Sequence, residues 1–408
     1  MDQARAAWLL PTPSGGVRPA RRADIAGTGY KMAETIAHQA KAHPAFCRPE
    51  VRTLPRYNAG LSEEAVRRQF GVEEISKLGS NENPYGPSPR VLREWPLLAG
   101  RLFLYPDASA TRLREGIARF NGIAMDRVVI GNGSEQIIRM IAEACLSPGE
   151  RVVTVRPAFG LHEIHPLLMG GVVDAVPVTA GGQFDIDGLC RALSRPTKIL
   201  IFSNPSNPVG CMMKEDALRA VIDACPPDTL VVVDEAYREY AETDADYPDA
   251  CAILREQERP WICLRTFSKA YGLAALRIGY ALTSSAEVAS VLETVRDTFN
   301  TTMPAQEMAA VALGDQSHMR DSVARTVAQR DRVAAALRAM GLFVAPTHTN
   351  FVFFRTARDA MSVAHDLLQH GVIVKPWKEK GFENWIRVSI GLPHDNDRFL
   401  THLAAVLG

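Results

Sequence analysis

The stretch Arg265-Thr-Phe-Ser-Lys269-Ala-Tyr-Gly-Leu-Ala-Ala-Leu-Arg277 points most directly to the fold of this chain. It follows residues 261–264, which favour a β-strand. The lysine comes directly after a hydroxyl side chain and eight residues before an arginine. A lysine amine can bond to an aldehyde, and a neighbouring hydroxyl and guanidinium can bind a phosphate. A lone lysine is usually a solvated surface charge, so the other contacts of such a ligand must come from elsewhere in the chain.

Two other apolar runs end in polar side chains that suit an aromatic aldehyde. Residues 230–234 predict a buried parallel strand with Asp234 at its carboxyl end, where it could pair with a protonated pyridine nitrogen. Tyr237 could reach the ring oxygen. Residues 198–210 predict a second strand and a loop presenting Asn207, whose amide could donate to the same oxygen. Alone, the aspartate could be a helix N-cap and the asparagine a turn residue. With the lysine they indicate pyridoxal phosphate.

A phosphate site is predicted where the strand after Arg127 gives way to a helix. Gly131-Asn-Gly133 forms the turn, and the free N–H groups near Ser134 and Glu135 can bind an anion. Glu135 would contribute only its backbone N–H. The third glycine of a dinucleotide fingerprint is absent, which argues against a nicotinamide or flavin dinucleotide. Phe159, after the next predicted strand, could stack on the cofactor ring, although a core phenylalanine is the simpler alternative.

Together these motifs resemble the fold-type I pyridoxal-phosphate aminotransferases and, among them, the histidinol-phosphate aminotransferase family. The resemblance runs from about Leu54 to the C-terminus. It is carried by residues 77–89, 105–107, 131–135, 203–210, 234–237, 268–269, Arg277 and 384–391. It implies an α/β fold with a large, mostly parallel sheet domain over 76–300. A smaller α+β domain would comprise 51–75 and 308–408, with helical periodicity continuing to Met340. Residues 1–50 are expected to be an N-terminal extension, partly disordered or a dimer arm.

The resemblance also implies roles for individual residues. Lys269 would be the covalent attachment point and proton shuttle, Asp234 would pair with the pyridinium nitrogen, and Phe159 would stack where the family often has tyrosine. The implied cofactor contacts are Ser134, Glu135, Phe159, Asn207, Asp234, Tyr237, Ser268, Arg277 and, reaching across from the partner subunit of a homodimer, Tyr105.

The substrate residues match the family less completely. Tyr57 corresponds to a tyrosine near the substrate phosphate, Asn83 lies on a loop that lines the substrate side, and Arg387 matches an arginine that grips acidic groups. Where the family usually has a second arginine, this chain has Lys375, which keeps the charge but lacks the bidentate fork. The implied reaction interconverts L-histidinol phosphate and imidazole acetol phosphate, with 2-oxoglutarate and glutamate as the other pair.

Other functions share most of these motifs. An aminotransferase for aromatic or other amino acids is one alternative, and a pyridoxal-phosphate-dependent decarboxylase of a phosphorylated amino acid is another. A non-enzymatic pyridoxal-phosphate sensor would carry a DNA-binding module before the fold. The first 50 residues are too short for that and lack a helix-turn-helix pattern.

Composition fits a large cytoplasmic enzyme. The 408 residues are 47% hydrophobic and carry 46 basic and 46 acidic side chains, so nothing points to nucleic acid or a membrane surface. The seven cysteines show no CxxC pair and are expected to be reduced thiols. His162 and His165 have the wrong spacing for a helical zinc motif, so we expect surface or interface histidines and no metal. No apolar run has transmembrane length, and no signal-peptide core is visible.

Overall fold

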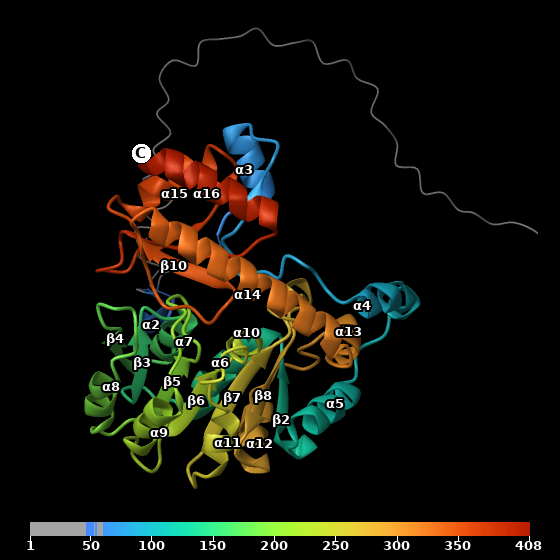
Figure 1. Ribbon diagram of the computed structural model, residues 1–408. Coiled ribbons are helices and arrows are strands. Elements are labelled where there is room, and N and C mark those ends of the chain that lie inside the picture. The colour runs from blue at the N-terminus through green and yellow to red at the C-terminus, as the bar shows by residue number, and fades with distance from the viewer. Residues whose placement is uncertain (1–45, 53, 55–59) are drawn as a thin grey trace, which may run out of the picture.

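The computed structural model describes residues 46–52, 54 and 60–408, which form two lobes with the long helix α14 (Gln316–Ala339) between them (Figure 1). Tyr57 and most of the predicted N-terminal extension lie outside the described residues. The lower lobe in Figure 1 contains the large sheet, and the upper lobe contains the C-terminal helices and a smaller sheet.

Seven strands form the large sheet in the order β2-β8-β7-β6-β5-β3-β4. Strand β8 runs antiparallel to both of its neighbours, and the remaining neighbours pair in parallel, so the predicted mostly parallel sheet is confirmed. Strands β5 and β6 read as continuous apolar runs up to their last residue because helices cover both faces of the sheet. The strands are β2 (Val128–Gly131), β3 (Arg151–Arg156), β4 (Val172–Pro177), β5 (Ile199–Ser203), β6 (Leu230–Asp234), β7 (Trp261–Thr266) and β8 (Gly279–Thr283).

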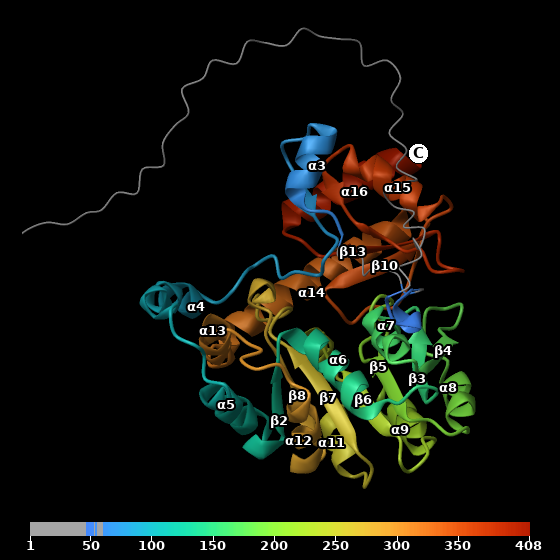
Figure 2. The same ribbon diagram turned by 180° about the vertical axis from the view of Figure 1, so that it is seen from behind.

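Alternate residues of each central strand belong to two different cores. In β5, Ile199 and Ile201 join the core under α6 and α12, whereas Leu200 and Phe202 join the core under α5, α8, α9 and α13. This alternation follows from the two-residue period of a strand. Figure 2 shows the sheet from behind, with α6 crossing in front of it. The helices of this lobe are α4 (Pro89–Glu94), α5 (Thr111–Asn121), α6 (Gly133–Cys145), α7 (Leu161–Leu168), α8 (Ile186–Leu193), α9 (Glu215–Asp223), α10 (Arg238–Ala241), α11 (Ala250–Arg255), α12 (Ala286–Thr294) and α13 (Met303–Leu313), with short 3-10 turns η1 (Trp95–Arg101), η2 (Met125–Arg127) and η3 (Ala274–Leu276).

The smaller lobe is built on a four-stranded antiparallel sheet, in the order β12-β13-β10-β9. Residues such as Val352 and Val388 pack under α14, α15 and α16, while Phe351 and Phe353 on the opposite face join the core of the large lobe. Arg387 is paired with Phe353 and so lies on the face directed toward the large lobe. The elements of this lobe are α3 (Glu63–Phe70), β1 (Ser76–Lys77), β9 (Phe343–Val344), β10 (Phe351–Arg355), α15 (Ala360–Leu368), β11 (Val372–Ile373), β12 (Lys375–Pro376), β13 (Trp385–Ser389) and α16 (Pro393–Leu407). The short helix α2 (Pro49–Arg52) lies beside α7 of the large lobe.

Two details differ from the sequence expectation. The helical run expected to continue to Met340 is interrupted at Gly314 and Asp315, where α13 ends and α14 begins. Strand β1, expected at the start of the large domain, pairs in parallel with β11 in a separate two-stranded sheet of the smaller lobe. We therefore propose that the smaller domain extends through Leu78, whose backbone also bonds to β11 and β13.

Candidate active site

The polar residues predicted from strand ends gather at one edge of the large sheet. Asp234 is the last residue of β6, Asn207 follows β5, and Lys269 follows β7. Because β5, β6 and β7 are parallel neighbours, their carboxyl ends lie side by side. In open α/β sheets this edge is where ligands bind.

Lys269 lies at this edge, three residues after the end of β7. Its Nζ lies 3.2 Å from the carbonyl oxygen of Ser80 and 5.7 Å from the ring centre of Tyr237. Burial, followed by the positive charge of Arg387, lowers the pKa of Lys269 to about 7. Near neutral pH a large fraction of this amine is therefore unprotonated, which is the form that attacks a carbonyl.

Asp234 has a partner that the sequence analysis missed. Its Oδ2 lies 3.3 Å from Nε2 of His162, and its Oδ1 accepts the backbone N–H of Ala236 at 3.1 Å. His162 is 0% exposed, so the expectation of a surface or interface histidine is wrong for this residue. It lies in the first turn of α7, where its ring meets Phe159 edge-on at 5.7 Å. The sequence gives one indication that His162 belongs to the site, namely its position three residues after Phe159, the predicted ring-stacking residue.

Arg387 reaches this edge from β13 of the smaller sheet. Its guanidinium donates to Asn207 Oδ1 at 2.6 Å and to the carbonyl oxygen of Gly79 at 2.9 Å. Lys375 is its cross-strand neighbour on β12. Burial, and then the charge of Arg387, lowers the pKa of Lys375 to about 8. Two cationic side chains therefore face the site from one sheet, an arrangement suited to an anionic group.

The two asparagines of the segment 81–83 have different surroundings. Asn83 donates to the carbonyl oxygen of Ala270 at 2.8 Å, and its Oδ1 accepts the N–H of Tyr85 at 2.9 Å. Both ends of the Asn83 amide are thus hydrogen-bonded to backbone groups, and one of these bonds connects the loop that contains Asn83 to Ala270, the residue after Lys269. Asn81 instead donates to the hydroxyl of Tyr237 at 2.8 Å.

The predicted phosphate site lies at the start of α6. Asn132 provides no side-chain cap, so the first N–H groups of the helix are not bonded to its amide. Ser268 Oγ lies 2.9 Å from Thr266 Oγ1 and 3.4 Å from an Arg277 nitrogen. Arg277 also pairs with Glu135 at 3.5 Å. Backbone N–H groups, a hydroxyl and a guanidinium are the donors that a phosphate requires.

The cradle requires glycine at two positions. Gly133 has a φ of 73°, in the left-handed region that favours glycine, and a Cβ on Gly279 would lie 2.5 Å from the backbone nitrogen of Ser134. Arg277 itself has a φ of 52°, in the left-handed region that residues other than glycine rarely adopt. Such strain persists where the surroundings hold it in place, commonly at a binding site.

Tyr105 lies away from the buried residues of the site, on the surface. It is 80% exposed, and its ring stacks on Phe299 with 4.5 Å between ring centres. The chain around it carries further exposed apolar side chains, namely Leu92, Trp95, Leu97, Leu102, Phe103 and Leu104. An exposed apolar patch of this kind is typical of a surface that another chain covers.

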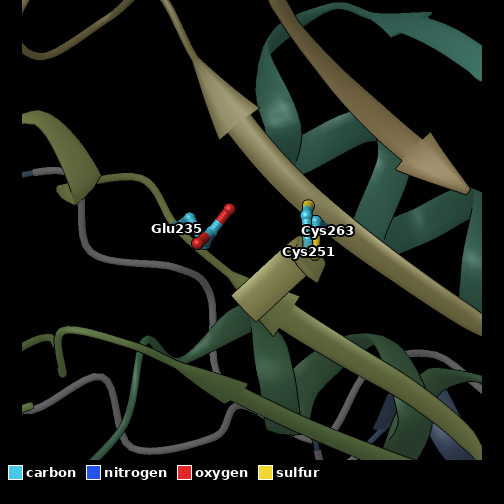
Figure 3. Close-up of side chains that lie close together, drawn as sticks. All are labelled: Glu235, Cys251 and Cys263. Atoms are coloured by element: carbon cyan, nitrogen blue, oxygen red, sulfur yellow. The ribbon is translucent and has the colours of Figure 1, made fainter. Parts of the chain in front are cut away.

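A second buried cluster lies on the large sheet, formed by Glu235, Cys251 and Cys263, whose ligand-type atoms lie within 4.8 Å of one another (Figure 3). Its carboxylate already has a cation, because Arg265 Nε donates to Glu235 Oε2 at 2.8 Å. Burial raises the pKa of the Cys263 thiol well above its usual range, which disfavours the thiolate that a metal needs. The geometry thus describes a buried ion pair with neighbouring thiols.

The sheet, the lysine at the end of β7 and the aspartate at the end of β6 define the class of protein: the fold is that of fold-type I pyridoxal-phosphate enzymes. Comparison with known proteins agrees. Residues 73–403 match the family model for aminotransferases of class I and II. The chain therefore belongs to the class I and II aminotransferase family, and it is an aminotransferase.

Individual relatives cover almost the whole described chain. Histidinol-phosphate aminotransferase 3 of Rhizobium meliloti (strain 1021) is 45% identical over 359 residues, which are 88% of this chain and 97% of that protein. The crystal structure of histidinol-phosphate aminotransferase from Sinorhizobium meliloti, in complex with pyridoxal-5'-phosphate, superposes with a TM-score of 0.81 at 29% identity, covering 89% of this chain and 98% of the other. L-threonine-O-3-phosphate decarboxylase from Porphyromonas gingivalis shares the fold, with a TM-score of 0.72 at 21% identity, covering 82% of this chain and 99% of the other. Within the described ranges, no helix is both long and apolar enough to cross a membrane.

Proposed function

We propose that this aminotransferase binds pyridoxal phosphate and transfers the amino group of L-histidinol phosphate to 2-oxoglutarate. The observation that carries the cofactor assignment is the buried Lys269, whose pKa is lowered to about 7, at the same sheet edge as Asp234 and the phosphate cradle. The donor set fits each part of the cofactor. Helix N–H groups suit the phosphate, a carboxylate suits a ring nitrogen, and an amine suits an aldehyde.

The cofactor would be held by residues at the carboxyl edge of the large sheet and at the start of α6. Bound pyridoxal phosphate supplies an aldehyde that bonds to amines and a ring that draws electrons from the adjoining carbon. We propose that Lys269 is the attachment point. The phosphate would be bound by Ser268, Arg277 and the backbone N–H groups of Ser134 and Glu135.

The ring would be held by the remaining contacts. Asp234 would keep a proton on the ring nitrogen, and His162 would hold the carboxylate in place. Phe159, which meets His162 edge-on, would lie against the ring face. Asn207 and Tyr237 would donate to the ring oxygen.

Lys269 would also move the substrate proton. In its unprotonated form, the Lys269 amine could accept a proton from the substrate carbon that bears the amino group and could donate it again during the transfer. A low amine pKa suits this task because the group must both take and give a proton near neutral pH. Ser80, whose carbonyl oxygen accepts from Nζ, would keep the amine beside the reacting carbon.

The substrate assignment rests on charge. Lys375 and Arg387 lie in register on neighbouring strands and face the large lobe, so they can share one dianionic group. We propose that they bind the phosphate of histidinol phosphate in one half-reaction and a carboxylate of 2-oxoglutarate in the other. Asn83, on the loop after β1, would contribute to substrate binding, and so would Tyr57, which lies outside the described residues. Relatives named histidinol-phosphate aminotransferase favour this substrate over an aromatic amino acid.

A homodimer with shared sites is part of the proposal. The exposed apolar segment around Tyr105 would form part of the interface, and the Tyr105 hydroxyl would reach the site of the partner subunit. All seven cysteines are free, which agrees with the predicted cytoplasmic location.

A substrate panel tests the assignment. The purified enzyme, loaded with pyridoxal phosphate, is mixed with single amino donors, and loss of its visible absorbance reports each half-reaction. We expect histidinol phosphate to react with the highest kcat/KM. Preferred reaction with phenylalanine or tyrosine would move the assignment to an aromatic aminotransferase, and release of carbon dioxide from a phosphorylated amino acid would move it to a decarboxylase.

A further inference from the structure

Asn81 connects the two lobes beside Tyr237. Its Nδ2 lies 2.8 Å from the tyrosine hydroxyl, and its carbonyl oxygen accepts from Asn350 Nδ2 at 3.0 Å. Ser389 Oγ lies 2.8 Å from the Asn81 backbone nitrogen and 2.9 Å from Asn81 Oδ1. Asn81 is 1% exposed, and all four of its polar atoms are hydrogen-bonded. Asn350 and Ser389 belong to the smaller lobe, whereas Tyr237 follows β6 of the large sheet.

These hydrogen bonds fix the direction of the proton at Tyr237. Ser389 Oγ accepts the backbone N–H of Asn81, so the hydroxyl proton of Ser389 goes to Asn81 Oδ1. The other end of the amide, Nδ2, then faces Tyr237. Because an amide nitrogen can only donate, the tyrosine oxygen must accept. The hydroxyl proton of Tyr237 is therefore directed to a different acceptor.

The backbone conformation at position 81 does not by itself require asparagine. Its φ is 55°, in the left-handed region, which glycine adopts without steric cost and asparagine adopts better than most other residues. Glycine would thus satisfy the backbone at this position. Only the amide of asparagine also reaches both Ser389 and Tyr237.

We propose that Asn81 is a positioning residue that turns the Tyr237 hydroxyl toward the ring oxygen of the bound cofactor and strengthens it as a donor. The proposal rests on the proposed function, in which Tyr237 contacts that oxygen. A hydroxyl whose oxygen accepts a hydrogen bond donates more strongly, because hydrogen bonds in a chain polarise one another. A stronger donor stabilises negative charge on the ring oxygen, and so keeps low the pH at which the visible absorbance of the loaded enzyme titrates.

The test is a spectral pH titration of the pyridoxal-phosphate-loaded enzyme. Asn81→Gly keeps the left-handed backbone and removes the amide, and we expect it to raise the titration midpoint by about 0.5 to 1 pH unit, the size of one hydrogen bond. Asn81→Asp should also raise the midpoint, because a carboxylate accepts the tyrosine proton instead of donating to the oxygen. Tyr237→Phe should raise it too, and adding Asn81→Gly to that variant should cause no further shift.

A matched control separates positioning from general stability. Asn396 is also 1% exposed, and its amide bonds the backbone of Gly391 at both ends, away from the site. Asn396→Ala should lower Tm without moving the midpoint.

The remaining outcomes distinguish failure of this inference from failure of the proposed function. An unchanged midpoint in folded Asn81→Gly or Asn81→Asp enzyme, or additive shifts with Tyr237→Phe, would overturn the role of Asn81 while leaving the proposed function intact. If the wild-type enzyme acquires no titrating visible absorbance with pyridoxal phosphate, the proposed function fails, and this inference fails with it.

Discussion

Arg387 and Asn207 are joined by a hydrogen bond of 2.6 Å, from the guanidinium to the amide oxygen, across the space between the two sheets. Asn207 is the residue we assign to the cofactor ring oxygen, and Arg387 is the one we assign to the substrate anion. An anion that pairs with Arg387 must share its guanidinium with Asn207. Binding of the substrate anion should therefore change the hydrogen bonding around the cofactor ring, because the Arg387 guanidinium would contact both the anion and Asn207.

Removing the lysine should remove turnover without unfolding the protein. We expect Lys269→Ala to have no measurable aminotransferase activity, yet to keep its Tm and to bind pyridoxal phosphate reversibly through the phosphate cradle. Lys198→Ala, at an exposed lysine beside β5, is the matched control and should keep full activity. Absorbance and dialysis distinguish covalent from reversible binding. Near-normal turnover in Lys269→Ala would end the assignment.

The amine of Lys269 should react at an unusually low pH in the cofactor-free enzyme. Burial and Arg387 lower its pKa from 10.5 to about 7, so competitive acetylation followed by mass spectrometry should give a midpoint near pH 7. Arg387→Met removes the second cause and should raise that midpoint. The unfolded chain keeps this proton up to about pH 10.5, so this group makes the free energy of unfolding rise with pH between about 7 and 10.5. A midpoint near 10 would show that the amine is not perturbed.

Asp234 should contribute to catalysis through its negative charge. We expect Asp234→Ala to lower kcat/KM by a factor that corresponds to about 3 kcal/mol, as for other preorganised charge partners. Asp216→Ala, in the first turn of α9, serves as a control and should have little effect. His162→Phe should cause a smaller loss than Asp234→Ala, since it leaves the carboxylate in place. A loss below tenfold, or about 1.4 kcal/mol, in Asp234→Ala would mean that Asp234 is not the partner of the ring nitrogen.

Shared active sites predict complementation between two inactive variants. In a heterodimer of Lys269→Ala and Tyr105→Ala chains, one site has both intact residues and the other has neither. Mixing equal amounts after reversible dissociation should restore about one quarter of the wild-type sites, since half of the dimers are mixed. Sedimentation should show a dimer, and Phe103→Asp in the exposed apolar segment should weaken it. A fully active monomer contradicts the shared site.

Lys375 should bind the negatively charged phosphate of the substrate. We expect Lys375→Ala to raise the KM for histidinol phosphate more than tenfold, because a partly buried cation facing a dianion is lost. The KM for an uncharged aromatic donor should change much less. Lys375→Arg should retain or improve binding of the phosphate, because arginine supplies a bidentate fork. Equal changes for the charged and the uncharged donor would remove Lys375 from the phosphate site.

Local patterns in the chain were enough to predict the mostly parallel sheet and several of the residues at its edge. Strands β5, β6 and β7 are buried on both faces, so β5 and β6 are apolar up to their last residue and β7 begins with the apolar run 261–264. The polar residues that end or follow these runs therefore stand out. Asp234, Asn207 and Lys269 could be identified for this reason, and parallel pairing then places them together. The turn before α6 was visible because glycines mark close approaches of the backbone.

The contacts between side chains of different elements became visible only in the folded protein. Asn81 and Asn83 stand two residues apart in an irregular loop that has no helical or strand period, so the sequence gives no sign of which one faces Tyr237. The contact of His162 with Asp234 depends on how α7 packs against the sheet, and that of Arg387 with Asn207 on how the two lobes pack. These positions lie 72 and 180 residues apart. Local patterns carry no information on such pairs, because their geometry is set by packing of whole elements and not by neighbours along the chain.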